Sequence, residues 1–300
     1  MSDKPFKHIP VLLKESIELL NIKDGGVYVD CTLGGGGHTE AILTASTPSP
    51  SGRGGLGVRA LGIDADQDAI EAAKQRLAKF SNIEYVHDNF RNLKKILTEK
   101  VDGILLDLGI SSYQIDEASR GFSIKHDGPL DMRMDQSLKL TAAAIINQFS
   151  QDGLVKIFSE YGEERFSKRI SNKICVMRNA GPIETTFQLK KIIEEAIPTW
   201  KKRESVTRIF QALRIAVNQE LDSLKTALLD AIDLLKPGGR IVAISYHSLE
   251  DRIVKHAFRN AKEEKKLKVL TKKPIRSSEA ETSSNPRAKS AKLRGGERIE

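Results

Sequence analysis

The sequence has little cysteine and no long apolar run, and both absences narrow the classes of protein to which it can belong. Cys31 and Cys175 lie far apart and outside any C-x-x-C pair, so neither a disulfide framework nor a zinc site is indicated, and no metal is expected. No stretch approaches the roughly 20 apolar residues that span a bilayer, and residues 1–7 lack the apolar core of a signal peptide. We therefore expect a cytoplasmic protein with no membrane partner.

The basic charge of the chain lies at its C-terminal end. The net charge is +8, and residues 255–300 hold 14 lysines and arginines against six acids, an excess that equals that of the whole chain. Such a segment is typical of proteins that contact a phosphate backbone, although many basic runs are only solvated surface. With 300 residues, 39% of them hydrophobic, the chain can form one large domain or two modest ones.

Residues 27–38, VYVDCTLGGGGH, form the motif around which the other motifs are arranged. A β-branched run predicts a buried strand, and four consecutive glycines then lead into an apolar helix from Thr39. Glycine allows the backbone to approach a ligand closely, and the amides at a helix N-terminus face it. The pattern therefore predicts a nucleotide-binding loop. A flexible turn remains the alternative, because the pattern is not a strict G-x-G-x-x-G.

Acidic residues end the strands that the sequence predicts. These strands are expected at residues 27–30, 60–64, 83–87 and 101–109. Asp30, Asp64, Asp88 and Asp107 lie at their carboxyl ends, where open α/β sheets bind ligands, so we expect the four side chains to line one crevice. Asp64 suits a ribose diol, as in sites for NAD or S-adenosylmethionine, with a simple turn residue as the alternative. Phe90 suits an adenine ring, or else the core.

The alternation of strands and helices stops for about a hundred residues after position 109, which predicts an inserted domain. Helical patterns at 141–149, 151–161, 163–179 and 186–196 indicate that the insert is all-helical. Its basic residues Arg165, Lys168, Arg169, Lys173 and Arg178 suit a nucleic-acid contact or a solvated helix face equally well.

The α/β pattern resumes with helices over residues 207–235, a turn at 236–239 and a strand at 240–246 that brings His247 to the same edge of the sheet. Two short strands are expected at 268–272 and 293–299, and the polar segment 277–290 between them is expected to be mobile. The predicted fold is thus a doubly wound α/β sheet, interrupted by a helical insert.

Several motifs closely resemble the bacterial 16S ribosomal RNA cytosine-N4 methyltransferase family, type H. They include DCT with GGH at residues 30–38, DLGISSYQ at 107–114, RGFS at 120–123, DGPLDMRMD at 127–135, FQALR at 210–214 and SYHSLEDR at 245–252. The resemblance extends from residue 8 to residue 294. Three departures stand out: the loop 48–57 is longer than usual, Ile209 replaces a common threonine, and Tyr246 replaces a common phenylalanine.

The resemblance implies a class I methyltransferase with a Rossmann-like sheet, formed by residues 1–112 and 207–300, and a substrate-recognition insert at 113–206. The implied donor is S-adenosylmethionine, and the implied reaction is N4-methylation of a cytidine in the decoding region, at the P site, of 16S rRNA. By position, the resemblance assigns contacts with the donor to Gly36, Gly37, His38, Asp64, Phe90, Asp107 and Gln114.

The catalytic residues follow from the chemistry of the exocyclic amine, whose lone pair is delocalised into the ring. Transfer needs in-line placement and an acceptor for the N–H, so we expect the loop from Asp107 to Ser112, with His247 opposite, to surround a flipped cytosine. Asp107 could instead be only a donor ligand. His247 and Asp131 have structural alternatives, the first fixing the strand end and the second capping a turn.

Two other classes share parts of this pattern. An NAD-linked oxidoreductase would use Asp64 and the glycine loop but gives no reason for the basic C-terminus, and a non-catalytic ribosome-assembly factor would keep the basic surface. The basic tail and the insert favour 16S rRNA within the assembled small subunit as the partner, read by shape and phosphate position. The sequence leaves the oligomeric state open, with a homodimer as one alternative.

Overall fold

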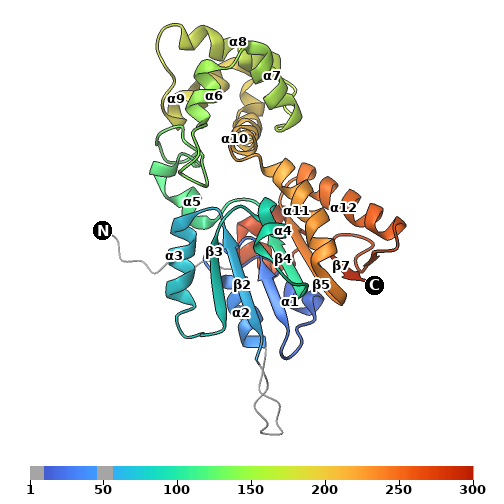
Figure 1. Ribbon diagram of the computed structural model, residues 1–300. Coiled ribbons are helices and arrows are strands. Elements are labelled where there is room, and N and C mark those ends of the chain that lie inside the picture. Colours follow the sequence, from blue (N-terminus) through green and yellow to red (C-terminus); the bar gives the residue numbers. More distant parts are fainter. Residues whose placement is uncertain (1–9, 46–56, 300) are drawn as a thin grey trace. The chain divides into compact units, whose positions relative to one another are not determined.

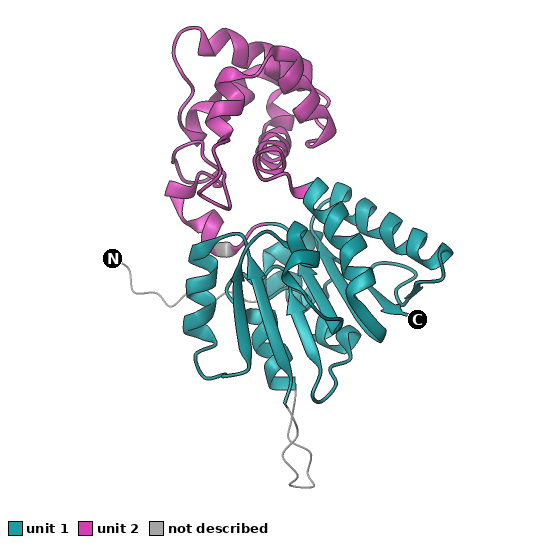
Figure 2. Cartoon of the chain, in the orientation of Figure 1, with its two compact units in different colours: residues 1–109, 221–300 teal, residues 110–220 magenta. Residues whose placement is uncertain are grey.

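The computed structural model describes residues 10–45 and 57–299, and the chain divides into two compact units (Figures 1 and 2). Unit 1 comprises residues 1–109 and 221–300, and unit 2 comprises residues 110–220. The loop expected at 48–57 lies, except for Gly57, outside the described residues. Among the described residues, none of the helices combines the length and apolarity that crossing a membrane would require.

A seven-stranded sheet of order β3-β2-β1-β4-β5-β7-β6 forms the centre of unit 1 (Figure 1). Its strands are β1 (Val27–Asp30), β2 (Arg59–Asp64), β3 (Ile83–His87), β4 (Val101–Asp107), β5 (Leu235–Ser245), β6 (Leu267–Val269) and β7 (Lys292–Arg298). The strands β1 to β5 are parallel to their neighbours, whereas β7 is antiparallel to both β5 and β6. The chain order reverses between β1 and β4, which is where doubly wound sheets bind ligands.

Helices cover both faces of this sheet because its strands are apolar on both sides. Alternate residues of β4 enter different cores: Ile104 and Leu106 pack with the helices α4, α11 and α12, whereas Leu105 packs with α1 and α2. The helices of unit 1 are α1 (Leu13–Leu20), α2 (Gly37–Ala45), α3 (Gln67–Arg76), α4 (Leu93–Ile96), α11 (Glu220–Leu234), α12 (Ser248–Glu263) and α13 (Glu279–Ser284), with 3-10 turns η1 (Phe90–Asn92) and η4 (Pro286–Ser290). Burial on both faces explains the continuous apolar runs of the parallel strands.

The segment 277–290 is ordered, contrary to the sequence-based expectation of mobility. It forms α13 and η4. The Ser278 hydroxyl accepts a hydrogen bond from the amide of Glu281, and the Glu281 carboxylate accepts one from the amide of Leu12 at 2.7 Å. A capped helix with a long-range anchor therefore forms where composition alone indicated a mobile segment.

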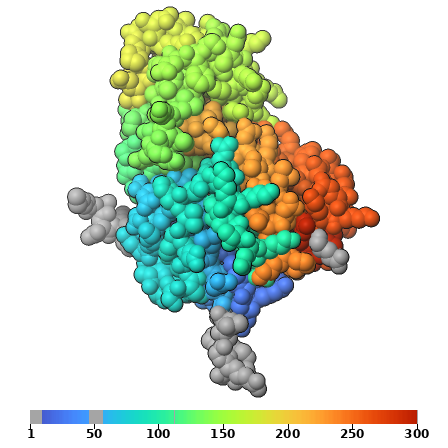
Figure 3. All heavy atoms as spheres, viewed as in Figure 1, coloured from blue at the N-terminus to red at the C-terminus, as the bar shows by residue number. Residues whose placement is uncertain are grey.

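Unit 2 is helical around one apolar core. It comprises α5 (Ser112–Asp116), η2 (Ala118–Arg120), α6 (Ala142–Gln148), α7 (Gln151–Glu160), α8 (Ser167–Arg178), α9 (Thr186–Ala196), η3 (Thr199–Lys201) and α10 (Lys202–Asn218). Side chains fill the spaces that the ribbon leaves between these helices (Figure 3). The sequence placed residues 207–220 with the sheet, but the structure places them in unit 2, because Ile209, Phe210 and Leu213 of α10 pack in its core.

Candidate active site

Four acids gather at the carboxyl edge of the parallel strands. Asp30, Asp64 and Asp107 are the last residues of β1, β2 and β4, and Asp88 directly follows β3. Because these strands are neighbours in the order β3-β2-β1-β4, the four side chains lie along one edge of the sheet, as the sequence indicated. We call this set the carboxylate edge.

The glycine loop between β1 and α2 is tightly packed. Gly34 and Gly36 have φ values of +49° and +74°, and a Cβ atom on Gly37 would lie 2.4 Å from Cγ of Pro10. The amide of Gly34 donates to Oδ2 of Asp64 at 2.8 Å, which joins the loop to the end of β2. Glycine is therefore required here both by conformation and by space.

Asp64 accepts hydrogen bonds from the backbone at both carboxylate oxygens, from the amide of Gly34 and from that of Asp66 at 2.9 Å. Burial raises its pKa to about 6, although these hydrogen bonds lower it. Each carboxylate oxygen has a further lone pair, so Asp64 retains the capacity to accept from two hydroxyl groups.

Asp107 lies between three polar groups at the end of β4. The Tyr246 hydroxyl donates to Oδ1 at 2.8 Å, and Nδ1 of His38 lies 3.6 Å from Oδ2. The amide of Asp107 donates to the Thr32 hydroxyl at 2.6 Å. Burial raises the pKa of Asp107 to about 7, although the hydrogen bond from Tyr246 lowers it. The carboxyl group thus changes charge near neutral pH.

Asp30 holds the two ends of the glycine loop. Its carboxylate accepts from the amide of Thr32 at 3.1 Å and from the Thr39 hydroxyl at 2.7 Å, and it is almost fully buried. Burial raises its pKa. His38 is also buried, its Nε2 lies 3.2 Å from the carbonyl oxygen of Val11, and burial lowers its pKa, which favours the neutral imidazole. We therefore assign Asp30 a structural role, in which it holds the glycine loop.

Two further expected donor contacts, Phe90 and Gln114, lie on different elements, as do the catalytic candidate Ser112 and the strand-end acid Asp88. Phe90 begins η1 and packs, partly buried, against the core of the sheet. Gln114 is buried in α5 of unit 2, where its side chain accepts from the amide of Ser111 at 3.0 Å. Ser112 is the first residue of α5, and its side chain lies outside the described residues. Asp88 accepts from the Asn92 side chain at 2.7 Å.

His247 caps the N-terminus of α12 at the end of β5. Its Nδ1 accepts from the amide of Glu250 at 3.4 Å, and its Nε2 lies 3.1 Å from Oε1 of the same residue. Glu250 in turn accepts from the amide of Tyr246 at 2.8 Å. These contacts match the structural alternative for His247, in which it fixes the strand end.

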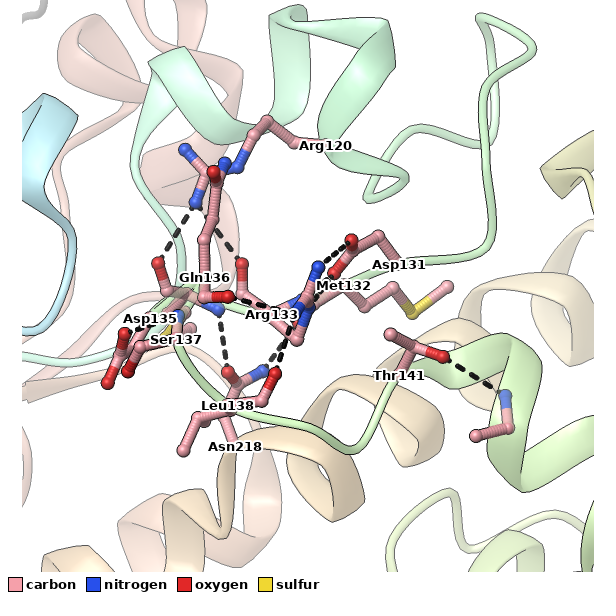
Figure 4. A network of polar contacts seen from close by, with 12 residues as sticks. Arg120, Asp131, Met132, Arg133, Asp135, Gln136, Ser137, Leu138, Thr141 and Asn218 are labelled. Atoms are coloured by element: carbon pink, nitrogen blue, oxygen red, sulfur yellow. Dashed lines mark hydrogen bonds and ion pairs between the residues drawn. The ribbon is translucent and has the colours of Figure 1, made fainter.

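Asp131 lies in a second polar network, within unit 2 (Figure 4). Its carboxylate receives two hydrogen bonds from the Arg133 guanidinium, both at 2.7 Å. Arg133 also donates to the carbonyl oxygens of Gln136 and Leu138, and Arg120 donates to those of Arg133 and Met134. We call residues 131–138 and Arg120 the arginine loop. Asp131 therefore fixes a turn, which is the structural alternative that the sequence analysis gave for it.

Three polar residues that contact the carboxylate edge were not predicted from the sequence. Thr32 and Thr39 hold Asp30, and Tyr246 donates to Asp107. A signal existed for Tyr246, because it ends the strand predicted at 240–246, which had to lie near β4. Apart from their place beside the glycines, nothing in the sequence marks the two threonines as contacts of Asp30.

The sheet order, the antiparallel β7 and the acids at the strand ends define a class I S-adenosylmethionine-dependent methyltransferase. Residues 5–299 match the model of the MraW methylase family, and the chain belongs to this family.

The chain is similar to proteins named ribosomal RNA small subunit methyltransferase H. It is 49% identical to that of Halothermothrix orenii, over 98% of this chain and 99% of the relative. It is 49% identical to that of Clostridium botulinum, over 96% and 98%, and 47% identical to that of Finegoldia magna, over 98% and 99%. The protein is therefore an enzyme of the methyltransferase class, with S-adenosylmethionine as its cofactor.

The carboxylate edge fits this cofactor by its chemistry. Within the described part of the chain, neither Asp64 nor Asp107 is paired with a lysine or arginine, and burial raises the pKa of both. A cationic sulfonium would supply the missing positive charge. The remaining lone pairs of Asp64 match a ribose diol.

Proposed function

We propose that this enzyme methylates N4 of a cytidine in the decoding region, at the P site, of 16S rRNA, within the assembled small ribosomal subunit. The observation that carries the proposal is the near full-length similarity to small-subunit rRNA methyltransferases, combined with an acid of raised pKa at the end of β4. A ribosomal substrate would place the enzyme in the cytoplasm.

The donor contacts in this proposal are Gly36, Gly37, His38, Asp64, Phe90, Asp107 and Gln114. Asp64 would hold the ribose hydroxyls, and the glycine loop would let the backbone approach the donor closely. S-adenosylmethionine supplies a methyl group on a cationic sulfur. Gln114 is included by its position in the family motif, since its carboxamide also caps α5.

Asp107 is the residue that we propose to accept the amine proton. As N4 forms its bond to the methyl carbon and the carbon–sulfur bond breaks, the nitrogen becomes positively charged and must lose a proton. Oδ1 already accepts from Tyr246, so Oδ2 is the oxygen that would take this proton. Ser112 follows five residues later in the chain and enters the proposal on its sequence position, while His247 would support the edge by capping α12.

Unit 2 would read the RNA. Two of the five basic residues considered on α8 and just before it have other partners: Arg178 donates to the carbonyl oxygens of Ile146 and Phe149, and Lys173 pairs with Glu195. Arg165, Lys168 and Arg169 are exposed and remain candidates for phosphate contacts.

Trp200 of unit 2 is a candidate for stacking on an unpaired nucleotide. Its side chain is 77% exposed on η3, Nζ of Lys201 lies 5.3 Å from its ring, and Lys202 and Arg203 follow. An exposed aromatic ring among cations is typical of surfaces that bind single-stranded RNA.

The proposal is tested by incubating the enzyme with labelled S-adenosylmethionine and small ribosomal subunits that lack the modification, beside free rRNA. We expect label in N4-methylcytidine, identified by mass, and only with assembled subunits. Label in another nucleoside would contradict the assigned chemistry. Donor binding without transfer to either substrate would instead favour a non-catalytic assembly factor.

Replacing Trp200 by alanine should weaken binding to small subunits by roughly five- to 150-fold, because base–aromatic stacking is worth about 1–3 kcal/mol. Trp200→Phe should retain most of the affinity. Leu229→Ala is the matched control, since Leu229 is an exposed apolar residue of unit 1, 63% exposed. Equal subunit affinities of the alanine variants would remove Trp200 from the proposed RNA surface.

A further inference from the structure

Tyr246 joins the end of β5 to the end of β4 through its side chain. Its hydroxyl donates to Oδ1 of Asp107 at 2.8 Å, across 139 positions of sequence. The ring packs over Gly109, where a Cβ atom would lie 3.3 Å from Cδ2 of Tyr246 and where φ is +102°. The amide of Tyr246 is fixed by the Glu250 carboxylate. Backbone, ring and hydroxyl of Tyr246 are thus each held in place.

The groups around Asp107 make this hydroxyl important. Glu250 of α12 is an acid that raises the pKa of Asp107, and Asp30 at the end of β1 is a second acid that interacts unfavourably with it. His38 of α2 faces Oδ2, but burial lowers its pKa, so it brings no positive charge near neutral pH.

The hydroxyl remains a donor across the working pH range. Burial and the Asp107 charge raise the pKa of Tyr246 well above its ordinary value, although the charge of Arg287 lowers it. The proton of this hydrogen bond therefore stays on tyrosine, and the bond favours the ionised form of Asp107.

We propose that Tyr246 is a positioning residue for methyl transfer, which binds Oδ1 of Asp107, keeps that carboxylate ionised and leaves Oδ2 to accept the amine proton. This inference rests on the role proposed above for Asp107. Because Tyr246 acts through Asp107 and does not itself accept the amine proton, Tyr246→Phe should leave an active enzyme whose activity depends differently on pH.

The test compares Tyr246→Phe with a matched control, Tyr28→Phe. Tyr28 is a buried tyrosine of the same sheet whose hydroxyl accepts from the amide of Lys23 at 2.7 Å, away from the carboxylate edge. Each variant loses one buried hydroxyl and keeps its ring, so comparable losses of stability are expected. Only Tyr246→Phe removes a donor from Asp107.

The first readout is kcat/KM for methyl transfer as a function of pH. Without the hydroxyl, the pKa of Asp107 rises, so the acid limb of the profile moves to higher pH. We expect Tyr246→Phe to lose roughly three- to tenfold in kcat/KM near pH 6.5, the range expected for one hydrogen bond, and to approach wild type above pH 8.5. Tyr28→Phe should keep the wild-type profile. A superimposable profile for Tyr246→Phe would overturn the inference while leaving the proposed function intact.

The second readout does not depend on turnover. The carboxyl carbon of Asp107, labelled with carbon-13 and assigned by the loss of its signal in Asp107→Asn, is titrated in all three proteins. A higher Asp107 midpoint in Tyr246→Phe alone supports the inference even if no RNA substrate is methylated. An unchanged midpoint contradicts it.

Discussion

The pKa values of partly buried acids shift in opposite directions at the carboxylate edge of unit 1 and in the arginine loop of unit 2. At the edge, burial raises the pKa of Asp64 to about 6 and that of Asp107 to about 7. In the arginine loop, burial also raises the pKa of Asp131, but two hydrogen bonds and the charge of Arg133 outweigh it, so the net shift is downward. Among the described residues, neither Asp64 nor Asp107 pairs with a lysine or arginine, whereas Asp131 pairs with Arg133.

This difference separates a ligand site from a structural network. An acid with a raised pKa destabilises the folded state at neutral pH, because its charge is buried without compensation. Such a cost is typical of a site that awaits a charged ligand. The paired acid of the arginine loop instead stabilises a turn that regular secondary structure does not support.

The largest effect is expected when the charge at the edge is removed. Asp107→Ala should lower kcat/KM by on the order of a thousandfold or more, since it removes the acceptor at the reacting amine. Asp107→Asn keeps an oxygen for the Tyr246 hydroxyl but loses the charge and the proton-accepting capacity. If Asp107 is catalytic, the asparagine variant should bind S-adenosylhomocysteine within about tenfold of wild type and still fail in transfer. Wild-type turnover in either variant would contradict the assignment of Asp107 as the proton acceptor.

Asp107→Asn should also be more stable than the wild type in alkaline solution. The Asp107 pKa is raised from 3.8 to about 7 on folding. The destabilisation is therefore absent below pH 4, grows between pH 4 and 7, and is complete above pH 7. Asp107→Asn should gain up to about 4 kcal/mol in free energy of unfolding at pH 8 and only about 1 kcal/mol at pH 4.5. Denaturant titrations at the two pH values measure this difference.

Sequence alone revealed the carboxylate edge because its signals are local. A strand ending in aspartate, or a run of glycines before a helix, is visible within a dozen residues, and parallel strands then bring such ends together. The contacts that set the pKa values of these acids are not local. Tyr246 donates to Asp107 across 139 positions of sequence, and neither residue alone indicates this hydrogen bond. Likewise, the sequence suggests that Arg178 is a surface cation, but its guanidinium donates to the carbonyl oxygens of Ile146 in α6 and of Phe149, the residue after α6.

The domain boundary was misplaced for a related reason. The helix pattern of residues 207–218 is amphipathic, and periodicity reports that a helix has an apolar face without identifying the core that receives it. Val206 and Ile209 of α10 pack against the helices of unit 2. The segment 277–290 was predicted to be mobile because of its polar composition, which does not reveal that Ser278 caps a short helix there.

In the arginine loop, removing the cation should cost stability. Arg133→Met removes the guanidinium that donates to Asp131 and to the carbonyl oxygens of Gln136 and Leu138, and leaves Asp131, of the donors on residue 133, only the backbone amide, at 3.0 Å. We expect a loss of about 1–3 kcal/mol in free energy of unfolding, with faster amide exchange over residues 131–142 and unchanged affinity for S-adenosylmethionine. Arg169→Met, at an exposed position of α8, is the control and should change stability by less than about 0.5 kcal/mol. A loss no greater than that of the control would show that the loop does not depend on the ion pair.

The smallest effect should be a pH-dependent preference for the charged donor over its uncharged product. S-adenosylmethionine carries a sulfonium charge that S-adenosylhomocysteine lacks, while both share the ribose and adenine. As pH rises through about 6 and about 7, Asp64 and Asp107 ionise and attract the sulfonium. The ratio of the two affinities, measured by calorimetry, should therefore rise by roughly three- to tenfold between pH 5.5 and pH 8 in favour of S-adenosylmethionine. Asp107→Asn should flatten this rise, whereas Arg133→Met should leave it unchanged because the Arg133 guanidinium binds the Asp131 carboxylate and, among the described residues, pairs with neither Asp64 nor Asp107. A flat ratio in the wild type would mean that the raised pKa values at the edge serve the transfer step and not the binding of the donor.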